Sequence, residues 1–196
     1  MTDLQRMRNV AKTGNADDAW LYGYALLNGC YPVENEHTRR CRKDVAEGIR
    51  WLESAAKRGC VGAMLELGDY YCSVATNSGQ DRLAKLNLAL YWEKMAWRHG
   101  ESIAAQNIAM TYALFGKPRR CFQWLNRGFK KCRWATIRSL AKSLYCGYGV
   151  RRNIERAKEL YKEIQRGGNE ADKEWARFYL RMIREGKIPS EIYPWP

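Results

Sequence analysis

Apolar residues recur along the chain in segments of helical length that end in a similar way. These segments are GIRWLESAAKRG ending at Gly59, ALYWEKMAWRHG at Gly100, CFQWLNRGFKKC at Cys132 and AKELYKEIQRGG at Gly168. In each segment a large apolar residue stands eight positions before the end: Trp51, Trp92, Trp124 and Leu160. A phrase that returns at uneven intervals predicts a helical repeat with loops of variable length. The large residues are expected in the core between neighbouring repeats.

A second helix of each repeat is predicted upstream, where a small residue recurs. The small residues are Gly23, Gly68, Ala109 and Ala141, and three positions later come Leu26, Tyr71, Tyr112 and Leu144. A Gly inside a helix lowers its intrinsic stability, so its recurrence predicts a close approach of two helix backbones. The closing glycines Gly59, Gly100 and Gly168 are expected to end their helices in the left-handed conformation.

These residues resemble the Sel-one-like repeat (SLR) family, which is related to the tetratricopeptide repeats. The family pattern is roughly A-x-x-x-L-G-x-x-Y-x-x-G-x-G-V, a loop, and A-L-x-W-x-x-x-A-A-x-x-G. Here ALFG and LYCGYGV match its first half, and GIRWLESAAKRG and ALYWEKMAWRHG match its second half. The resemblance implies an all-α fold, a right-handed α-solenoid of stacked antiparallel helix pairs with about four repeats and a C-terminal capping helix.

The repeats are expected within one domain of residues 1–196, at about 14–59, 60–100, 101–132 and 133–168, with a capping helix and tail over 169–196. Repeat one departs from the pattern through its enlarged loop, CYPVENEHTRRCRKD, and repeat three through the short connection PRR. The tail IPSEIYPWP cannot continue a helix past Pro189, and we expect it to fold back over the end of the last helix.

The first helices of such solenoids line a concave surface. The positions expected to be exposed there form one pair on each first helix. They are Trp20 and Tyr24, Leu65 and Asp69, Gln106 and Met110, Arg138 and Lys142, and Arg177 and Arg181. Members of a pair are four residues apart and share a helix face. The series changes from aromatic to basic, which predicts a graded partner-binding surface with Trp20, Tyr24, Gln106, Met110, Arg138, Lys142, Arg177 and Arg181 as its binding residues.

The charge of the chain is concentrated in its second half. The net charge is +13, and residues 101–196 carry twenty basic against nine acidic groups. No Asp or Glu occurs between Glu101 and Glu155, whereas eleven Lys or Arg occur from Lys117 to Arg152. This asymmetry indicates an acidic partner. Part of the charge is expected on the solvated convex face of repeat three: Arg119, Arg120, Arg127, Lys130 and Lys131.

The sequence lacks the residue sets of common active sites, and it predicts neither an enzyme nor a cofactor. The two histidines, His37 and His99, lie in different repeats, and CGYGV follows a helix rather than a strand, unlike a nucleotide-binding loop. Cys30, His37 and Cys41 share one loop, but their spacings of seven and four do not fit a common zinc motif. No metal site is therefore predicted.

Seven cysteines without a framework spacing, and no apolar leader after Met1, favour a reducing, cytoplasmic setting. A periplasmic setting stays open if a leader has been removed, and Cys30 could then pair with Cys41. No apolar run reaches the length that spans a membrane.

The leading functional hypothesis is a non-catalytic scaffold that binds an acidic protein partner. The SLR resemblance implies an adaptor, and several small bacterial proteins of this type are immunity proteins that neutralise a toxin delivered by a secretion system. Alternatives are a signalling adaptor and a nucleic-acid-binding helical-repeat protein. The sequence pI near 9.5 prompts the nucleic-acid alternative, together with aromatic residues among the cations: Phe122, Trp124, Phe129 and Trp134.

Overall fold

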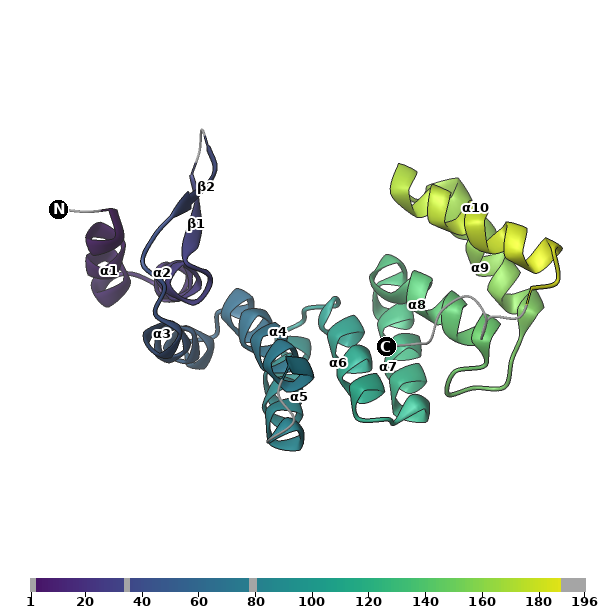
Figure 1. Ribbon diagram of the computed structural model, residues 1–196, viewed down its shortest axis with the longest axis horizontal. Helices are drawn as coiled ribbons and strands as arrows, with labels where there is room; N and C mark the ends of the chain where they lie inside the picture. Colours follow the sequence, from purple (N-terminus) through teal and green to yellow (C-terminus); the bar gives the residue numbers. More distant parts are fainter. Residues whose placement is uncertain (1–2, 34–35, 78–80, 188–196) are drawn as a thin grey trace. The chain divides into compact units, whose positions relative to one another are not determined.

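The computed structural model describes residues 3–33, 36–77 and 81–187, with the backbone alone at positions 32, 33, 36 and 37. The chain divides into two compact units, Met1–Glu101 and Ser102–Pro196. The first contains α1 (Asp3–Thr13), α2 (Ala16–Asn28), β1 (Cys30–Val33), β2 (Glu36–Arg40), α3 (Val45–Lys57), α4 (Val61–Asn77) and α5 (Arg82–Arg98) (Figure 1). The second contains α6 (Ala104–Leu114), α7 (Pro118–Lys131), α8 (Arg133–Cys146), α9 (Ile154–Gly167) and α10 (Glu170–Arg184).

In the first unit, consecutive helices pack as hairpins: α2 packs on α3 and α4 packs on α5. A Cβ at Gly23 would lie 3.1 Å from the carbonyl oxygen of Gly48, and one at Gly48 would lie 2.8 Å from the backbone nitrogen of Leu27. The predicted close approach of two helix backbones is confirmed here. Gly68 differs, because the space beside it holds the side chain of Glu93, whose Cγ would be 2.9 Å from an added Cβ.

In the second unit each helix from α6 to α10 packs on the next. Tyr145, Tyr161, Trp175 and Tyr179 form an aromatic cluster across α8, α9 and α10, in which the Tyr161 and Tyr179 rings stack at 5.2 Å. This cluster joins the capping helix α10 to the helix pair that precedes it.

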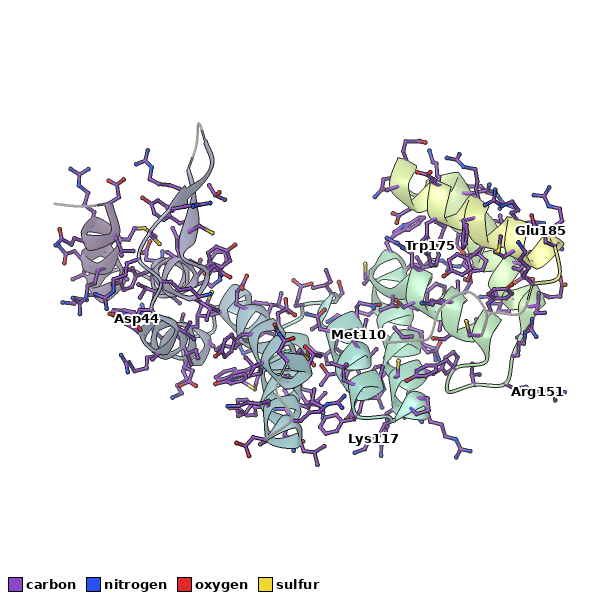
Figure 2. The ribbon with its side chains drawn as sticks, in the orientation of Figure 1. Asp44, Met110, Lys117, Arg151, Trp175 and Glu185 are labelled. Atoms are coloured by element: carbon purple, nitrogen blue, oxygen red, sulfur yellow. The ribbon has the colours of Figure 1, made fainter. Side chains whose placement is uncertain are left out.

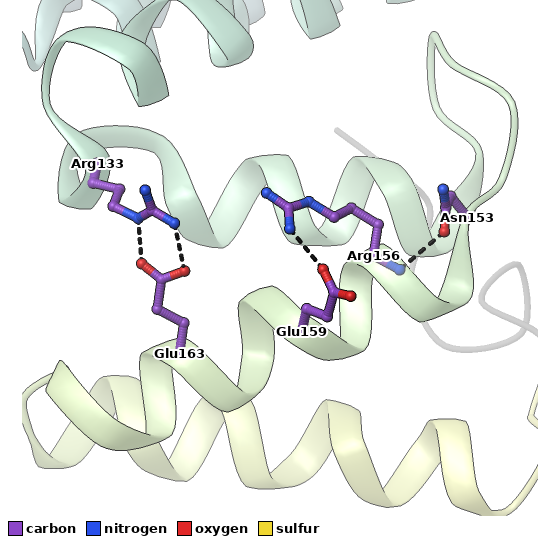
Figure 3. A network of polar contacts seen from close by, with 5 residues as sticks. All are labelled: Arg133, Asn153, Arg156, Glu159 and Glu163. Carbon is purple, nitrogen blue, oxygen red and sulfur yellow. Dashed lines mark hydrogen bonds and ion pairs between the residues drawn. The ribbon is translucent and has the colours of Figure 1, made fainter.

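A polar link reinforces the pairing of α8 with α9 (Figure 3). Arg133 Nε and Nη2 donate to the two carboxylate oxygens of Glu163, the second at 2.9 Å. On α9 itself, Arg156 pairs with Glu159 at 2.6 Å, and the Asn153 side chain caps the helix by accepting from the Arg156 backbone N–H at 2.9 Å. The bidentate bridge fixes the relative position of α8 and α9.

The large residues of the repeat phrase lie in or beside the core, as the sequence predicts. Trp92 is 6% exposed, Trp124 is 9% exposed and Leu160 is fully buried. Trp51 is half-buried, meets the Tyr22 ring edge-on at 5.3 Å and donates to Glu47 at 3.4 Å. These tryptophans therefore serve packing rather than a ligand cage.

The helix ends confirm the expected left-handed glycines at two positions and correct a third. Gly59 and Gly100 have φ of +93° and +100°. Gly168 is extended instead, with φ −76° and ψ 166°. The reason is that Asn169 already forms the N-cap of α10, so the chain must run straight from one helix into the next. The prediction of a left-handed Gly168 is wrong.

Two elements of the first unit lie outside the expected helix pairs. Helix α1 packs Leu4, Met7 and Ala11 against Tyr22 and Leu26 of α2. The enlarged loop holds an antiparallel hairpin, β1 with β2, in which Cys30 faces Arg40 and Tyr31 faces Arg39. The all-α expectation is therefore incomplete in this loop. The tail from Ile188 to Pro196 lies outside the described residues.

The hairpin and α1 are tied together at Asp3. The Tyr31 hydroxyl donates to Asp3 at 3.2 Å, and Arg39 forms an ion pair with the same carboxylate. These contacts hold the pKa of the Asp3 carboxyl below its usual value, chiefly through the hydrogen bond from Arg39. Helix α1 thereby covers the outer end of the first helix pair, as terminal elements of repeat arrays must.

Candidate functional site

A pocket of about 630 Å³ lies within the second unit, between α6, α8 and α10. Its walls include Gln106 and Met110 from α6, together with Arg138 and Lys142 from α8. Trp134 from α8 and Asp172 and Trp175 from α10 also line it, beside the smaller side chains of Ala135, Thr136, Ser139 and Asn169. We call this pocket the α8 groove. Four of the eight predicted binding residues meet there.

The groove face of α8 follows from its spacing. Trp134, Arg138 and Lys142 are four residues apart and therefore stand in one row along the helix. Thr136 is buried and its hydroxyl donates to the carbonyl oxygen of Leu125 on α7 at 2.8 Å. This bond fixes the rotation of α8 about its own axis, so the row faces α6 and α10.

Arg138 is the electrostatic centre of the groove. Its Nη1 lies 3.1 Å from Oδ1 of Asp172, and its guanidinium carbon lies 4.8 Å from the ring centroid of Trp175. The Arg138 side chain is 50% exposed, whereas that of Asp172 is only 20% exposed. Part of the guanidinium thus stays open to a ligand while α10 holds it in place.

The groove also offers apolar surface. The Trp134 indole lies over the last turn of α9, since a Cβ at Gly167 would be 2.8 Å from its Cζ2, and Trp134 remains 48% exposed. Met110 and Trp175 are half-buried, and Figure 2 labels both, on α6 and α10. Flexible Met and rigid Trp side chains are common at surfaces that receive apolar anchors.

The aromatic members of the predicted series lie on α2, in the first unit. The Trp20 ring covers Gly62 at the start of α4, where an added Cβ would be 3.0 Å from the indole, and lies 6.5 Å from the ring of Tyr24. Burial raises the pKa of the Tyr24 hydroxyl. Trp20 and Tyr24 therefore share one surface, and its continuity with the α8 groove stays a prediction.

Asp69, the charged member of the second predicted pair, lies in another pocket of the first unit. That pocket lies between the end of α2 and residues 66–74 of α4, and Lys43 and Glu66 also line it. The pKa of the Glu66 carboxyl is raised, chiefly by burial and to a smaller extent by the negative charge of Asp69. Asp69 is thus an acidic member of the predicted series, whereas the pair in the α8 groove from helix α8, Arg138 and Lys142, is basic.

Arg177 and Arg181 do not line the α8 groove. They border a separate pocket with Gln165 and Phe178, and the Arg181 guanidinium lies 5.8 Å from the Phe178 ring centroid. The two arginines lie roughly 140° and 180° around α10 from Asp172, at about 100° per residue. Arg177 and Arg181 therefore lie on another side of α10 than Asp172, and their predicted role in partner binding stays a prediction.

Sequence reasoning also missed three groove residues: Trp134, Asp172 and Trp175. The signal for the last two was present, because the buried residues of α10 are Ala176, Tyr179 and Met182, and Asp172 and Trp175 lie one turn before the first two of them on the helix surface. From the sequence, Trp134 is only one of several aromatic residues among cations. Its place at the first turn of α8, four residues before Arg138, puts it on the groove face.

Among the described residues, no group of three or more His, Cys, Asp and Glu side chains could hold a metal ion. Cys30 and Cys41 are free thiols, and burial raises the pKa of Cys41. The side chain of His37 lies outside the described part of the chain. The described helices include none with the length and apolar character needed to cross a membrane.

Solved structures with the same fold exist. One is a protective antigen present in uropathogenic Escherichia coli strains that displays an SLR fold: it shares 23% identity over 95% of this chain, with a TM-score of 0.70. Another is a Sel1 repeat protein from Oxalobacter formigenes, with 23% identity over 92% of this chain and a TM-score of 0.67. The chain spans 37% and 66% of their respective lengths. No family model matches the sequence, and no curated protein does. The likeness confirms the expected SLR solenoid fold.

Proposed function

We propose that this chain is a non-catalytic scaffold whose α8 groove binds an acidic segment of a protein partner. The observation that carries the proposal is the position of Arg138, half exposed beside Lys142 and flanked by Trp134 and Trp175. Apolar anchors bordered by cations are the combination that gives protein interfaces both affinity and orientation. The SLR fold supports a role in protein interaction.

Binding would use the two sides of the groove differently. An apolar side chain of the partner packs among Met110, Trp134 and Trp175, where it removes apolar surface from water. A partner carboxylate pairs with Lys142 and with the open side of Arg138, in competition with Asp172. The charge of residues 101–196 accelerates encounter with an acidic partner through long-range attraction.

The partner of the α8 groove can be proposed more specifically. The SLR resemblance supports a toxin delivered by a secretion system, which this chain would neutralise as an immunity protein in the bacterial cytoplasm. If the chain is a signalling adaptor instead, the same groove would bind a signalling protein of the cell that makes it. Purification of the complex from the native host, followed by identification of the bound protein, separates these two partners.

The test uses the partner recovered in that way and two matched variants of the full chain. Trp134→Ala with Lys142→Glu should weaken binding by about 100-fold or more, because it removes an apolar anchor and reverses a groove charge. Arg177→Glu with Arg181→Glu changes more charge on the far side of α10 and should weaken binding less. Isothermal titration calorimetry gives both affinities. Unchanged binding by the groove variant, or a larger loss of affinity in the control, would show that the α8 groove is not the binding site.

A further inference from the structure

Helix α7 presents an exposed face made almost entirely of cations. Arg119, Arg120, Arg127 and Lys130 are all exposed, while Cys121, Trp124, Leu125 and Gly128 on the other side of the helix are buried. At about 100° per residue, the four cations fall within an arc of about 100°, and at about 1.5 Å per residue they extend over about 16 Å. We call these four residues the α7 stripe.

The α7 stripe is not neutralised by its own unit. Helix α7 packs against α6 and α8, and no Asp or Glu occurs in any of the three helices. Within the described part of the chain, none of the four side chains forms an ion pair with a carboxylate. By contrast, Arg133 and Arg138 on the neighbouring helix are paired with Glu163 and Asp172. An uncompensated row of cations destabilises the chain by repulsion, so it fits a surface whose charge is used in binding.

The α7 stripe lacks the features of a protein interface. The only uncharged residue exposed on α7 is Gln123. Arg127 lies over the Trp124 ring at 4.9 Å and Arg133 over the Phe129 ring at 4.7 Å, so each ring already has a cation over one face. Protein interfaces are depleted in charged residues at their centre and depend on apolar anchors, which this face does not provide.

The same geometry argues against two other polyanions. Single-stranded nucleic acids bind on open aromatic faces, and two of the three rings of α7, those of Trp124 and Phe129, already have a cation over them. Surface helices that bind membranes insert their apolar side into the bilayer, but the apolar side of α7 is buried in the unit. The remaining class of partner is a linear polyanion that is held by charge alone.

We propose that the α7 stripe binds the phosphate backbone of duplex nucleic acid without reading its sequence. A duplex carries about one charge per 1.7 Å of axis with both strands counted, so a piece of duplex as long as the stripe contains about ten phosphates, and those on its near side face the stripe. Arginine suits this role, because its planar guanidinium donates two parallel hydrogen bonds to a phosphate. Apart from the cations, this face exposes one side chain that could hydrogen-bond to a base edge, Gln123. A single amide reads little sequence, so we expect nearly equal affinity for unrelated sequences.

The experiment measures fluorescence anisotropy of labelled DNA duplexes of about 20 base pairs, in two unrelated sequences, from about 50 to 200 mM salt. The variant Arg119→Gln, Arg120→Gln, Lys130→Gln removes three stripe charges and leaves Arg127 over Trp124. Its matched control is Arg151→Gln, Lys162→Gln, Arg166→Gln, which removes three exposed cations from the α9 side of the same unit. Far-UV circular dichroism confirms that both variants fold.

Wild type and control should bind both duplexes equally, with a steep dependence of affinity on salt. The stripe variant should bind about 100-fold more weakly at low salt, and the slope of log Kd against log salt should be shallower by about 3. Equal losses in both variants would show a net-charge effect and overturn the proposal. The proposal would also be overturned if the chain bound no duplex but bound phosphatidylserine vesicles or polyglutamate through the stripe. The partner would then be a membrane or an acidic protein.

Discussion

The carbonyl oxygen of Pro118 lies where a side chain at Gly149 would have to begin. A Cβ built on Gly149 would be only 2.0 Å from that oxygen, and Gly149 also has a φ of +72°. The contact joins the turn after α8 to the first residue of α7. Gly149 is therefore required twice, for its backbone conformation and for the space beside it.

Gly149→Ala is expected to destabilise the protein by about 2 to 4 kcal/mol, from the left-handed strain and the displacement of Pro118 together. Gly116→Ala is the matched control, because Gly116 has a φ of +67° with no atom within 4 Å of an added Cβ. It should cost only about 1 kcal/mol. Urea denaturation of both variants measures the difference, and equal losses would show that the Pro118 contact is unimportant.

Trp92 tests the core of the repeats. Trp92→Ala should cost about 3 to 5 kcal/mol, because it removes a side chain that is 6% exposed and leaves a cavity. Trp134→Ala makes the same chemical change at a position 48% exposed, and it should cost far less. Thermal unfolding followed by circular dichroism compares the two. Similar losses would contradict the assignment of Trp92 to the core.

The link between α8 and α9 predicts a dependence of stability on pH. The hydrogen bond from Arg133 holds the pKa of the Glu163 carboxyl below its ordinary value. The Glu163 carboxylate therefore takes up a proton less readily in the folded state than in the unfolded chain. Its contribution to the free energy of unfolding is fully present above the ordinary carboxyl pKa of about 4.3. It is lost as the pH falls through the lower pKa of the folded state.

Glu163→Gln should accordingly melt slightly below wild type at pH 7, and the two melting temperatures should converge as the pH falls below about 4. Glu155→Gln on the same helix removes an equal charge that has no ion-pair partner among the described residues, and it controls for net charge. A constant gap between wild type and Glu163→Gln across this range would show that the bridge to Arg133 does not stabilise the fold.

The helix pairs were predictable because their signals are local and repeated. One signal is a large residue eight positions before a glycine, which identifies Trp51 and Trp92. The other is the left-handed backbone at the end of the helix, which glycine adopts most easily and which Gly59 and Gly100 have. Gly168 shows the limit of that rule, since its conformation depends on the N-cap at Asn169 and not on its own helix. The sequence therefore predicted the repeating architecture but not every junction.

The elements that occur only once were harder to predict. Helix α1 has a short apolar face whose partner, Tyr22, is recognisable only once α2 is placed. The β hairpin depends on the contacts of Tyr31 and Arg39 with Asp3, a residue far away in sequence. The capping helix has no following repeat to confirm its register, so the sequence alone does not show that Trp175 lines the α8 groove and Arg177 does not.

The ion pair between Arg138 and Asp172 gives the last prediction, which rests on the proposed groove. An acidic partner must compete with Asp172 for the guanidinium of Arg138, which lies 3.1 Å from that carboxylate. Asp172→Asn removes the competing charge but keeps the side-chain shape. It should therefore strengthen partner binding by about threefold to tenfold, with a small loss of stability because α10 loses an acidic residue from its first turn.

Glu174→Gln is the control, since it removes the same charge from the exposed side of α10, outside the α8 groove. Long-range attraction alone would raise affinity equally in both variants and only at low salt, because distant charges are screened. A local effect at Arg138 should persist at about 150 mM salt, where the Debye length is about 8 Å. Titration calorimetry at two salt concentrations distinguishes these cases. Weaker binding by Asp172→Asn would mean that Asp172 contacts the partner directly, and the groove would then favour a partner with a cation at that point.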